Sequence, residues 1–185
     1  ISVLDGLEET GGANTQIIYA RGSNLDYDAA FETKAGMFGK DLKRDNRPVD
    51  QLIEEALNAA KEADVIVAAV GESAEMSGES SSRTNIDIPQ AQTDLLAALK
   101  KTGKPIVILL FAGRPMAITQ VANDFPAILN VWFGGSEAGY AIADVLFGDV
   151  NPSGKLSMTF PQNIGQVPLF YNHKNTGRPL AEGKW

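Results

Sequence analysis

Three glutamates lie on one segment whose composition suits acid chemistry. Glu72, Glu75 and Glu79 fall within residues 71–88, GESAEMSGESSSRTNIDI, a stretch of 18 residues without helical or strand periodicity. Loops longer than about 12 to 15 residues inside compact domains are usually functional or disordered. A carboxylic acid on such a loop can donate a proton if burial raises its pKa towards neutrality, whereas a carboxylate in water stays ionised. Two interpretations of the segment follow: it is a loop that carries a general acid, or it is a solvated acidic surface.

Composition excludes several other kinds of site. The chain has no cysteine and a single histidine, His173, which rules out disulfides, thiolate nucleophiles and zinc sites built on cysteines or on several histidines. His173 lies among turn formers, which predicts a surface residue and disfavours a Ser-His-Asp triad. Calcium binding is a further reading of the glutamates, but the segment lacks the alternating ligands and closing glutamate of an EF-hand. We expect neither a metal nor a cofactor.

The charge balance and the apolar runs exclude two classes of partner. Sixteen Lys and Arg against 23 Asp and Glu give a net charge of −7 and a pI near 4.7, so the field of the chain repels phosphate backbones and anionic lipid. No apolar run approaches the ~18 to 20 residues needed to cross a bilayer, and the opening residues lack a basic region followed by an apolar one. We expect no nucleic acid, no membrane and no signal peptide in this stretch.

The elements that must position the loop follow from two alternating periods. The continuously apolar runs 65–70 and 105–112 predict strands buried on both faces, as in parallel sheets. Each follows a run with helical spacing: one begins after Pro48, and the other begins near Pro89 and stops at Gly103. The loop of the three glutamates therefore leaves the end of the first buried strand.

The same alternation continues more weakly along the chain. It predicts a short helix at 115–122, a strand at 127–133 and a helix from Ser136 to Gly148. Two further strands are predicted, an edge strand at 155–160 and a candidate at 15–20. Helices interleaved with about five strands define an α/β fold class, an open, mostly parallel sheet flanked by helices on both faces.

The two ends of the chain differ from the middle. Residues 2–9 have a helix-like pattern with no strand before them, whereas such folds usually open on a strand. Residues 161–185 are rich in Pro, Gly and Asn and predict an extended tail or linker. We expect an α/β domain at 1–160, with its first strand missing, and a tail at 161–185 that leads towards a following domain. The whole is expected to be a fragment of a multidomain protein.

Other strand ends offer weaker candidates. The GGSEAG turn after the strand at 127–133 resembles a phosphate-binding turn, but Glu137 would repel a phosphate, so a structural tight turn is favoured. Trp132 and Phe133 could pack on a sugar ring, although core aromatics are commoner. Arg114 could pair with a carboxylate, but capping of its own strand end is the favoured reading.

Several motifs together resemble a known family. They are GES at 71–73, SSRTNIDIP at 81–89, GKPIVILLFAGRPMAI at 103–118, WFGGSEAGYAIADVLFGDVNPSGKLSMTFP at 132–161 and HKNTGRP at 173–179. On these residues the chain resembles the second, α/β sandwich domain of glycoside hydrolase family 3, of the kind found in bacterial β-glucosidases of the periplasmic type. The motifs cover more than half of the chain, and the long run from 132 to 161 is specific.

The resemblance implies a retaining, exo-acting β-glucosidase that hydrolyses terminal β-linked glucose, in the periplasm or outside the cell. In this family an aspartate on an amino-terminal barrel attacks the anomeric carbon, and a glutamate from a loop of the second domain acts as acid and then as base. The two carboxyl groups of such a pair stand about 5 to 5.5 Å apart. The barrel would be a partner within the same protein, and a fragment without it should be inactive.

Carried over onto this sequence, the acid/base matches Glu79, which precedes Arg83 by four residues where many family members have three. Glu75 is the second choice, and Glu72 is the third. Two other readings remain open. One is a non-catalytic scaffold or carbohydrate-contacting domain that braces the barrel, and the other is a nucleotide-binding α/β domain.

Overall fold

A single parallel sheet organises the part of the chain that the computed structural model describes, which is residues 1–33, 36, 42–175 and 177. In those residues it has three strands in the order β1–β2–β3, namely β1 (Ile66–Gly71), β2 (Ile106–Phe111) and β3 (Ala127–Asn130). In register, Ile66 lies opposite Ile106, and Val107 lies opposite Ala127. The open parallel α/β fold predicted from the sequence is therefore confirmed.

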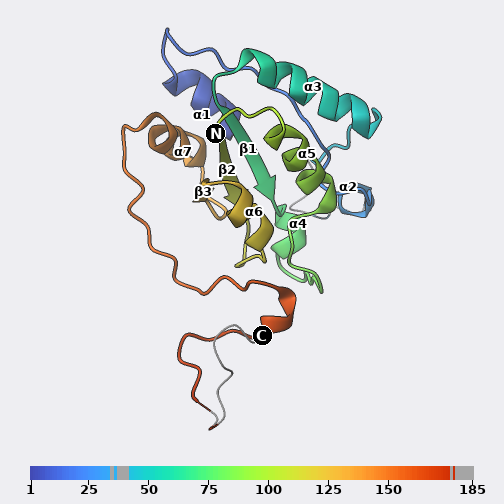
Figure 1. Ribbon diagram of the computed structural model, residues 1–185, viewed down its shortest axis with the longest axis vertical. Helices are drawn as coiled ribbons and strands as arrows, with labels where there is room; N and C mark the ends of the chain where they lie inside the picture. Colours follow the sequence, from blue (N-terminus) through green and yellow to red (C-terminus); the bar gives the residue numbers. More distant parts are fainter. Residues whose placement is uncertain (34–35, 37–41, 176, 178–185) are drawn as a thin grey trace.

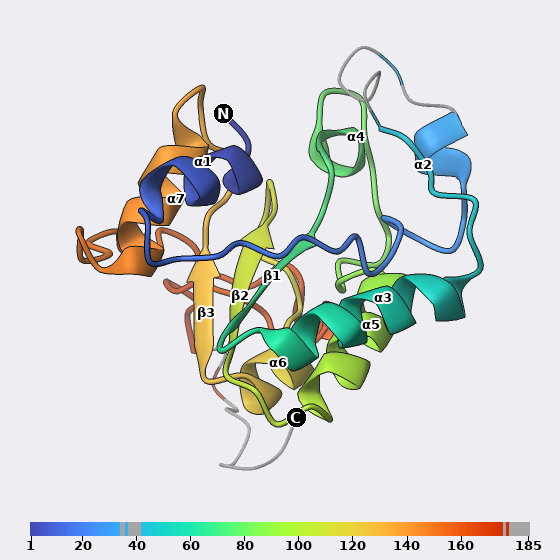
Figure 2. The ribbon, with the colours of Figure 1, turned by 90° about the horizontal axis from the view of Figure 1, so that it is seen from above.

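Helices cover both faces of this sheet. In chain order they are α1 (Val3–Thr10), α2 (Ala30–Thr33), α3 (Val49–Glu62), α4 (Ala74–Ser77), α5 (Gln90–Lys100), α6 (Thr119–Asp124) and α7 (Ala138–Phe147), followed by a 3-10 turn at Ile164–Gln166. Helices α1 and α7 lie together on one side, and α3 and α5 lie together on the other (Figure 1). Seen from above, the sheet stands between these two groups (Figure 2).

The central strand carries the best-buried side chains. Ile108 and Leu109 of β2 are 0% exposed and Leu110 is 1% exposed, although successive side chains of a strand point to opposite faces. A strand buried on both faces needs apolar residues at every position, which explains the unbroken IVILLF run. On the α3, α5 and α6 side, β1 and β2 pack against Leu96 and Val121 in one apolar cluster.

Helix α1 forms as its sequence pattern predicts and packs closely on α7. Ser2 caps it in a reciprocal capping box with Asp5. The two helices meet at glycines, since a Cβ on Gly6 would lie 2.3 Å from the carbonyl oxygen of Gly139. A side chain at either position would force the helices apart.

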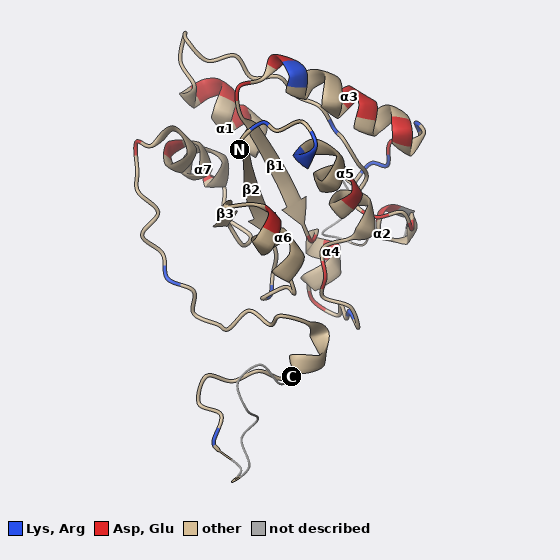
Figure 3. Cartoon of the chain, in the orientation of Figure 1, with Lys and Arg blue, Asp and Glu red and all other residues tan. Residues whose placement is uncertain are grey.

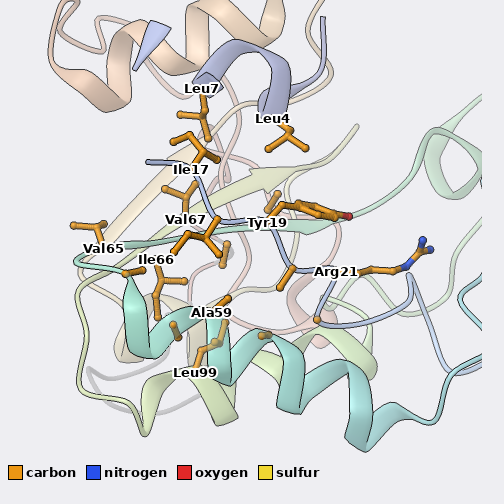
Figure 4. Close-up of a pocket in the computed structure, with 18 of the residues that line it drawn as sticks. Leu4, Leu7, Ile17, Tyr19, Arg21, Ala59, Val65, Ile66, Val67 and Leu99 are labelled. Carbon is orange, nitrogen blue, oxygen red and sulfur yellow. The ribbon is translucent and has the colours of Figure 1, made fainter. Parts of the chain in front are cut away.

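The outer face of β1 borders a cavity of about 390 Å³. Leu4 and Leu7 of α1 and Ile17 lie on one side of it, and Val65 and Val67 lie on the other (Figure 4). The strand predicted at 15–20 is wrong, because this segment runs past β1 without pairing to any strand of the described sheet. The two segments are separated by the cavity, so their backbones do not form a ladder.

Three further expectations need correction. Residues 155–160 form no strand: Leu156 and Met158 are 63% and 59% exposed, and of the three alternating apolar residues only Phe160 packs against the apolar cluster. Strand β3 ends at Asn130 rather than 133 because Trp132 has a φ of 53°, which no strand residue adopts. The N-cap of α7 is Glu137 rather than Ser136.

Candidate functional site

The glutamate segment lies beyond the carboxyl end of β1. The chain leaves the strand at Gly71, forms the short helix α4 and returns to α5 (Figure 1). Ligands of open parallel sheets bind outside the carboxyl ends of the strands, so the segment stands where a site is expected. The sequence predicts no regular structure in this segment, whereas the structure contains the short helix α4 there.

A buried glutamine fixes the point where the loop starts. The backbone N–H of Gly71 donates to Oε1 of Gln92 at 2.7 Å, and Nε2 of Gln92 donates to the carbonyls of Gly71 at 3.0 Å and Leu25 at 2.8 Å. Gly71 has a φ of 127°, and a Cβ there would lie 1.9 Å from the carbonyl oxygen of Phe111. Only glycine fits at this position.

Glu72 is the centre of an ion-pair cluster that involves two arginines. Its side chain is 0% exposed, and Oε1 lies 2.7 Å from Nη1 of Arg83. Nε of Arg114 lies 3.2 Å from Oε1 and 3.3 Å from Oε2, and the N–H of Gly113 donates to Oε2 at 3.4 Å. A buried carboxylate is tolerated because charged donors satisfy it. The expectation that Arg114 caps its own strand end is wrong, since it binds this carboxylate.

The same two arginines also bind the backbone of the loop. Nη2 of Arg114 donates to the carbonyl of Met76 in α4 at 2.7 Å, and Nη2 of Arg83 donates to the carbonyl of Asp87 at 3.1 Å. Within the loop, Oγ of Ser81 donates to the carbonyl of Glu75 at 2.6 Å. The loop is therefore tied to the sheet at its start, at α4 and near its end.

Glu75 is half-buried in the first turn of α4. It borders an open hollow of about 290 Å³ together with Ala30, Phe31, Ser81 and Ser82. Its Oε1 is buried and accepts no hydrogen bond from the described residues. Glu75 thus points towards its own domain.

Glu79 lies in the turn that follows α4 and is exposed to solvent. Its neighbour Ser80 has a φ of 61°, in the left-handed region, so the chain reverses direction here. The structure brings Glu72, Glu75 and Glu79 onto one loop in three different environments: buried in an ion-pair cluster, half-buried and exposed.

The other strand ends meet this loop. A Cβ on Gly113, after β2, would lie 2.4 Å from Oγ of Ser77 in α4 and 3.2 Å from the ring of Phe133, after β3. Phe133 is 44% exposed, whereas Trp132 is partly buried with its ring centroid 6.0 Å from that of Phe160. Of the two aromatic residues, Phe133 is the more exposed and offers more surface to a ligand.

The remaining candidates do not form sites in the described residues. His173 is exposed, as the sequence predicts. A Cβ on Gly134 would lie 2.5 Å from Cβ of Ala138, which fits the structural tight turn expected for GGSEAG. The described residues contain no cluster of three or more His, Cys, Asp or Glu side chains placed to hold a metal ion. They also contain no helix long and apolar enough to span a membrane.

The distribution of charged residues differs between the helices and the base of the loop. Acidic residues are concentrated in α1 and α3 (Figure 3). Around Glu72, by contrast, two guanidinium groups surround one carboxylate, which leaves a local excess of positive charge at the base of the loop. This local excess was not predicted from the sequence.

Fold and site together define an α/β domain that presents a braced, carboxylate-bearing loop outside the carboxyl ends of its strands. The family model described as the glycosyl hydrolase family 3 C-terminal domain matches residues 1–184. The chain belongs to this family.

The relatives agree with this assignment. The chain is 50% identical to a periplasmic beta-glucosidase of Salmonella typhimurium over 184 residues, 100% of this chain and 24% of that protein. It is 40% identical to a beta-xylosidase of Formosa agariphila, covering 92% of this chain and 21% of that protein. The chain therefore spans about a quarter of the length of these curated relatives.

Solved structures show the same fold. A beta-glucosidase from Listeria innocua in complex with gluconolactone has a TM-score of 0.70 and 43% identity, covering 75% of this chain and 20% of that chain. A beta-glucosidase from Erythrobacter marinus has a TM-score of 0.79 and 34% identity, covering 96% of this chain and 25% of that chain.

Proposed function

We propose that this chain is the C-terminal domain of a retaining, exo-acting β-glucosidase that removes terminal β-linked glucose residues. The names of the Salmonella and Listeria relatives support a glucoside substrate. A related beta-xylosidase makes β-xylosides the competing substrate class.

In the proposed reaction an aspartate from a barrel domain of the same protein attacks the anomeric carbon while the bond to the leaving group breaks. Glu79 gives its proton to the departing glycosidic oxygen. In the second step Glu79 takes a proton from water, the water oxygen bonds to the anomeric carbon, and the bond to aspartate breaks. A retaining mechanism places the two carboxyl groups about 5 to 5.5 Å apart.

The observation that carries the assignment is the exposure of Glu79 on a loop that is otherwise tied down. Glu72 is enclosed by its ion pairs, and Glu75 points towards a hollow of its own domain. Glu79 alone of the three is free to reach a neighbouring domain. Coverage by that domain would remove water from around the carboxyl group, and burial favours the protonated form that a general acid needs.

The wider organisation of the protein is part of the same proposal. Residues 1–160 would pack against the barrel, and residues 161–185 would form the tail towards a following domain; of that tail, residues 176 and 178–185 lie outside the described part. A periplasmic or extracellular location is supported by the name of the Salmonella relative. The 185 residues alone should have no glucosidase activity, because the nucleophile would be missing.

A scaffold role is the second candidate, and the same exposure favours it. A carboxylate left in water stays ionised and cannot act as a general acid. If the barrel does not cover Glu79, this domain only braces the barrel or contacts the sugar.

The test is Glu79→Ala in the full-length protein, with the exposed Glu62→Ala on α3 as matched control. We expect kcat/KM to fall by ~10² to 10⁴-fold on a disaccharide but far less on a dinitrophenyl β-glucoside, because that leaving group departs without a proton. Equal, near-normal values on both substrates would move the role to Glu75. If Glu75→Ala were also silent, the scaffold would be the correct reading.

A further inference from the structure

We propose that Glu72 is a positioning residue, which holds the loop that carries Glu79 by binding Arg83 and Arg114 at once. This inference rests on the proposed function of Glu79. Glu72 itself does not contact substrate, because its side chain has no exposed surface and its oxygens are occupied by the two arginines and the N–H of Gly113.

The two arginines reach different parts of the same loop from different parts of the fold. Arg83 belongs to the loop, near its return to α5, and its side chain is 11% exposed. Arg114 follows β2, the neighbouring strand, and its side chain is 27% exposed. Their second hydrogen bonds go to the carbonyls of Asp87 and Met76. One carboxylate thereby joins the loop start, the loop end and α4.

Glu79 lies between these fixed points. The helix before it is tied through Met76, and the chain after it through Ser81 and Arg83. A proton donor must approach the glycosidic oxygen within hydrogen-bond distance, and a shift of about 1 Å can cost 10²-fold in rate. The ion-pair cluster therefore acts on the reaction through the placement of Glu79.

The charge of Glu72 matters more than its size. Glutamine is nearly isosteric with glutamate, but it leaves two guanidinium groups close together without a counter-charge. Like charges in a site of low dielectric repel one another, and each loses its charged acceptor. In Glu72→Gln we expect the arginines to separate and the loop to move, while the sheet stays folded.

The experiment compares Glu72→Gln with wild type and with Glu54→Gln, an exposed residue of α3, in the full-length β-glucosidase. We expect kcat/KM on a disaccharide to fall by ~10²-fold and kcat/KM on a dinitrophenyl β-glucoside to stay within about threefold. A purely structural role would lower both values equally, and that result, or no loss on either substrate, would overturn the proposal. If Glu72→Gln precipitates, Arg83→Lys, which keeps the charge but loses the forked geometry, should show the same preference.

Hydrogen–deuterium exchange separates this proposal from the proposed function. If the loss of kcat/KM in Glu79→Ala does not depend on the leaving group, Glu79 is not the acid/base. Amide exchange alone then tests whether Glu72 holds the loop in place. We then expect residues 73–82 to exchange at least ~10-fold faster in Glu72→Gln, with β2 unchanged. Unchanged exchange in the loop would overturn the positioning role whatever the kinetics of Glu79→Ala.

Discussion

Oε1 of Glu72 lies 2.7 Å from Nη1 of Arg83, and the two residues are 11 positions apart at opposite ends of one loop. The pair closes the loop into a ring at the carboxyl end of β1. Arg114 then fixes this ring to the neighbouring strand through the same carboxylate. The energetic importance of the cluster follows from its burial, because breaking one side leaves a charge without enough partners.

The buried pair predicts a clear stability difference between two arginines. Arg83→Met removes a partner from a fully buried carboxylate, and we expect the free energy of unfolding to fall by about 2 to 4 kcal/mol, with Arg114 limiting the loss. Arg47→Met is the control, since Arg47 is 45% exposed where it pairs with Asp45 and Glu55, and its loss should lower the free energy of unfolding much less. Denaturant unfolding of the 185 residues measures both, and equal losses would contradict the ranking.

Two glycines with left-handed backbone should respond very differently to alanine. Gly71 and Gly103 have φ values of 127° and 70°, but a Cβ would collide with the carbonyl of Phe111 only at Gly71. We expect Gly103→Ala to cost about 1 to 2 kcal/mol from backbone strain alone. Gly71→Ala should cost about 4 kcal/mol or more, because β1 and β2 must also separate. Thermal unfolding distinguishes them, and similar melting temperatures would contradict the predicted collision at Gly71.

Gln92 is predicted to matter through its hydrogen bonds rather than its volume. Gln92→Leu leaves the N–H and carbonyl of Gly71 without their partner, and we expect a loss of about 2 to 4 kcal/mol in unfolding free energy. Gln90→Leu, two positions earlier and exposed, removes one hydrogen bond to Asp94 and should change stability by less than about 1 kcal/mol. An unchanged free energy of unfolding in Gln92→Leu would contradict this prediction and show that water replaces the lost hydrogen bonds.

Tyr27 should lose its proton at a higher pH than an ordinary tyrosine. Its hydroxyl donates to Oδ2 of Asp94 at 2.5 Å, and this hydrogen bond to a carboxylate raises the pKa of Tyr27 to about 12. A raised pKa favours the neutral form, so its contribution to stability is fully present below about pH 10 and is lost as the pH rises through about 12. In an ultraviolet titration, Tyr27→Phe should remove a component near pH 12, and Asp94→Asn should shift that component lower. A Tyr27 component near pH 10 in the unsubstituted chain would contradict the contact.

The two continuously apolar runs are the elements that the sequence predicted best. The runs at 65–70 and 105–112 became β1 and β2 within one residue at each end. Burial on both faces is confirmed for β2 but is wrong for β1, where Val67 is 36% exposed beside the cavity. The strand predicted at 155–160 is absent from the described residues. Its alternation describes a surface covered on one side, but Leu156 and Met158 lie exposed in the described chain, and only Phe160 packs against the apolar cluster.

The site was predicted in part. The position of the loop follows from β1, so its three glutamates were found as candidates. The ion pair between Glu72 and Arg114 was not found, because the two residues are 42 positions apart and meet only when β1 and β2 lie side by side. The GRP turn directly after the second apolar run does place Arg114 at a strand end. An arginine at a strand end can cap the strand or bind a carboxylate, so the sequence alone does not identify its partner.

We propose Glu79 as the acid/base of a retaining β-glucosidase. The most direct measurement is the product that the full-length Glu79→Ala variant forms from a dinitrophenyl β-glucoside in the presence of azide. Without a general base, water attacks the glucosyl enzyme slowly, whereas azide needs no deprotonation and should increase the turnover rate. Nuclear magnetic resonance should identify the product as β-glucosyl azide. An α-configured azide would contradict retention, and the absence of any azide adduct would contradict the role of Glu79.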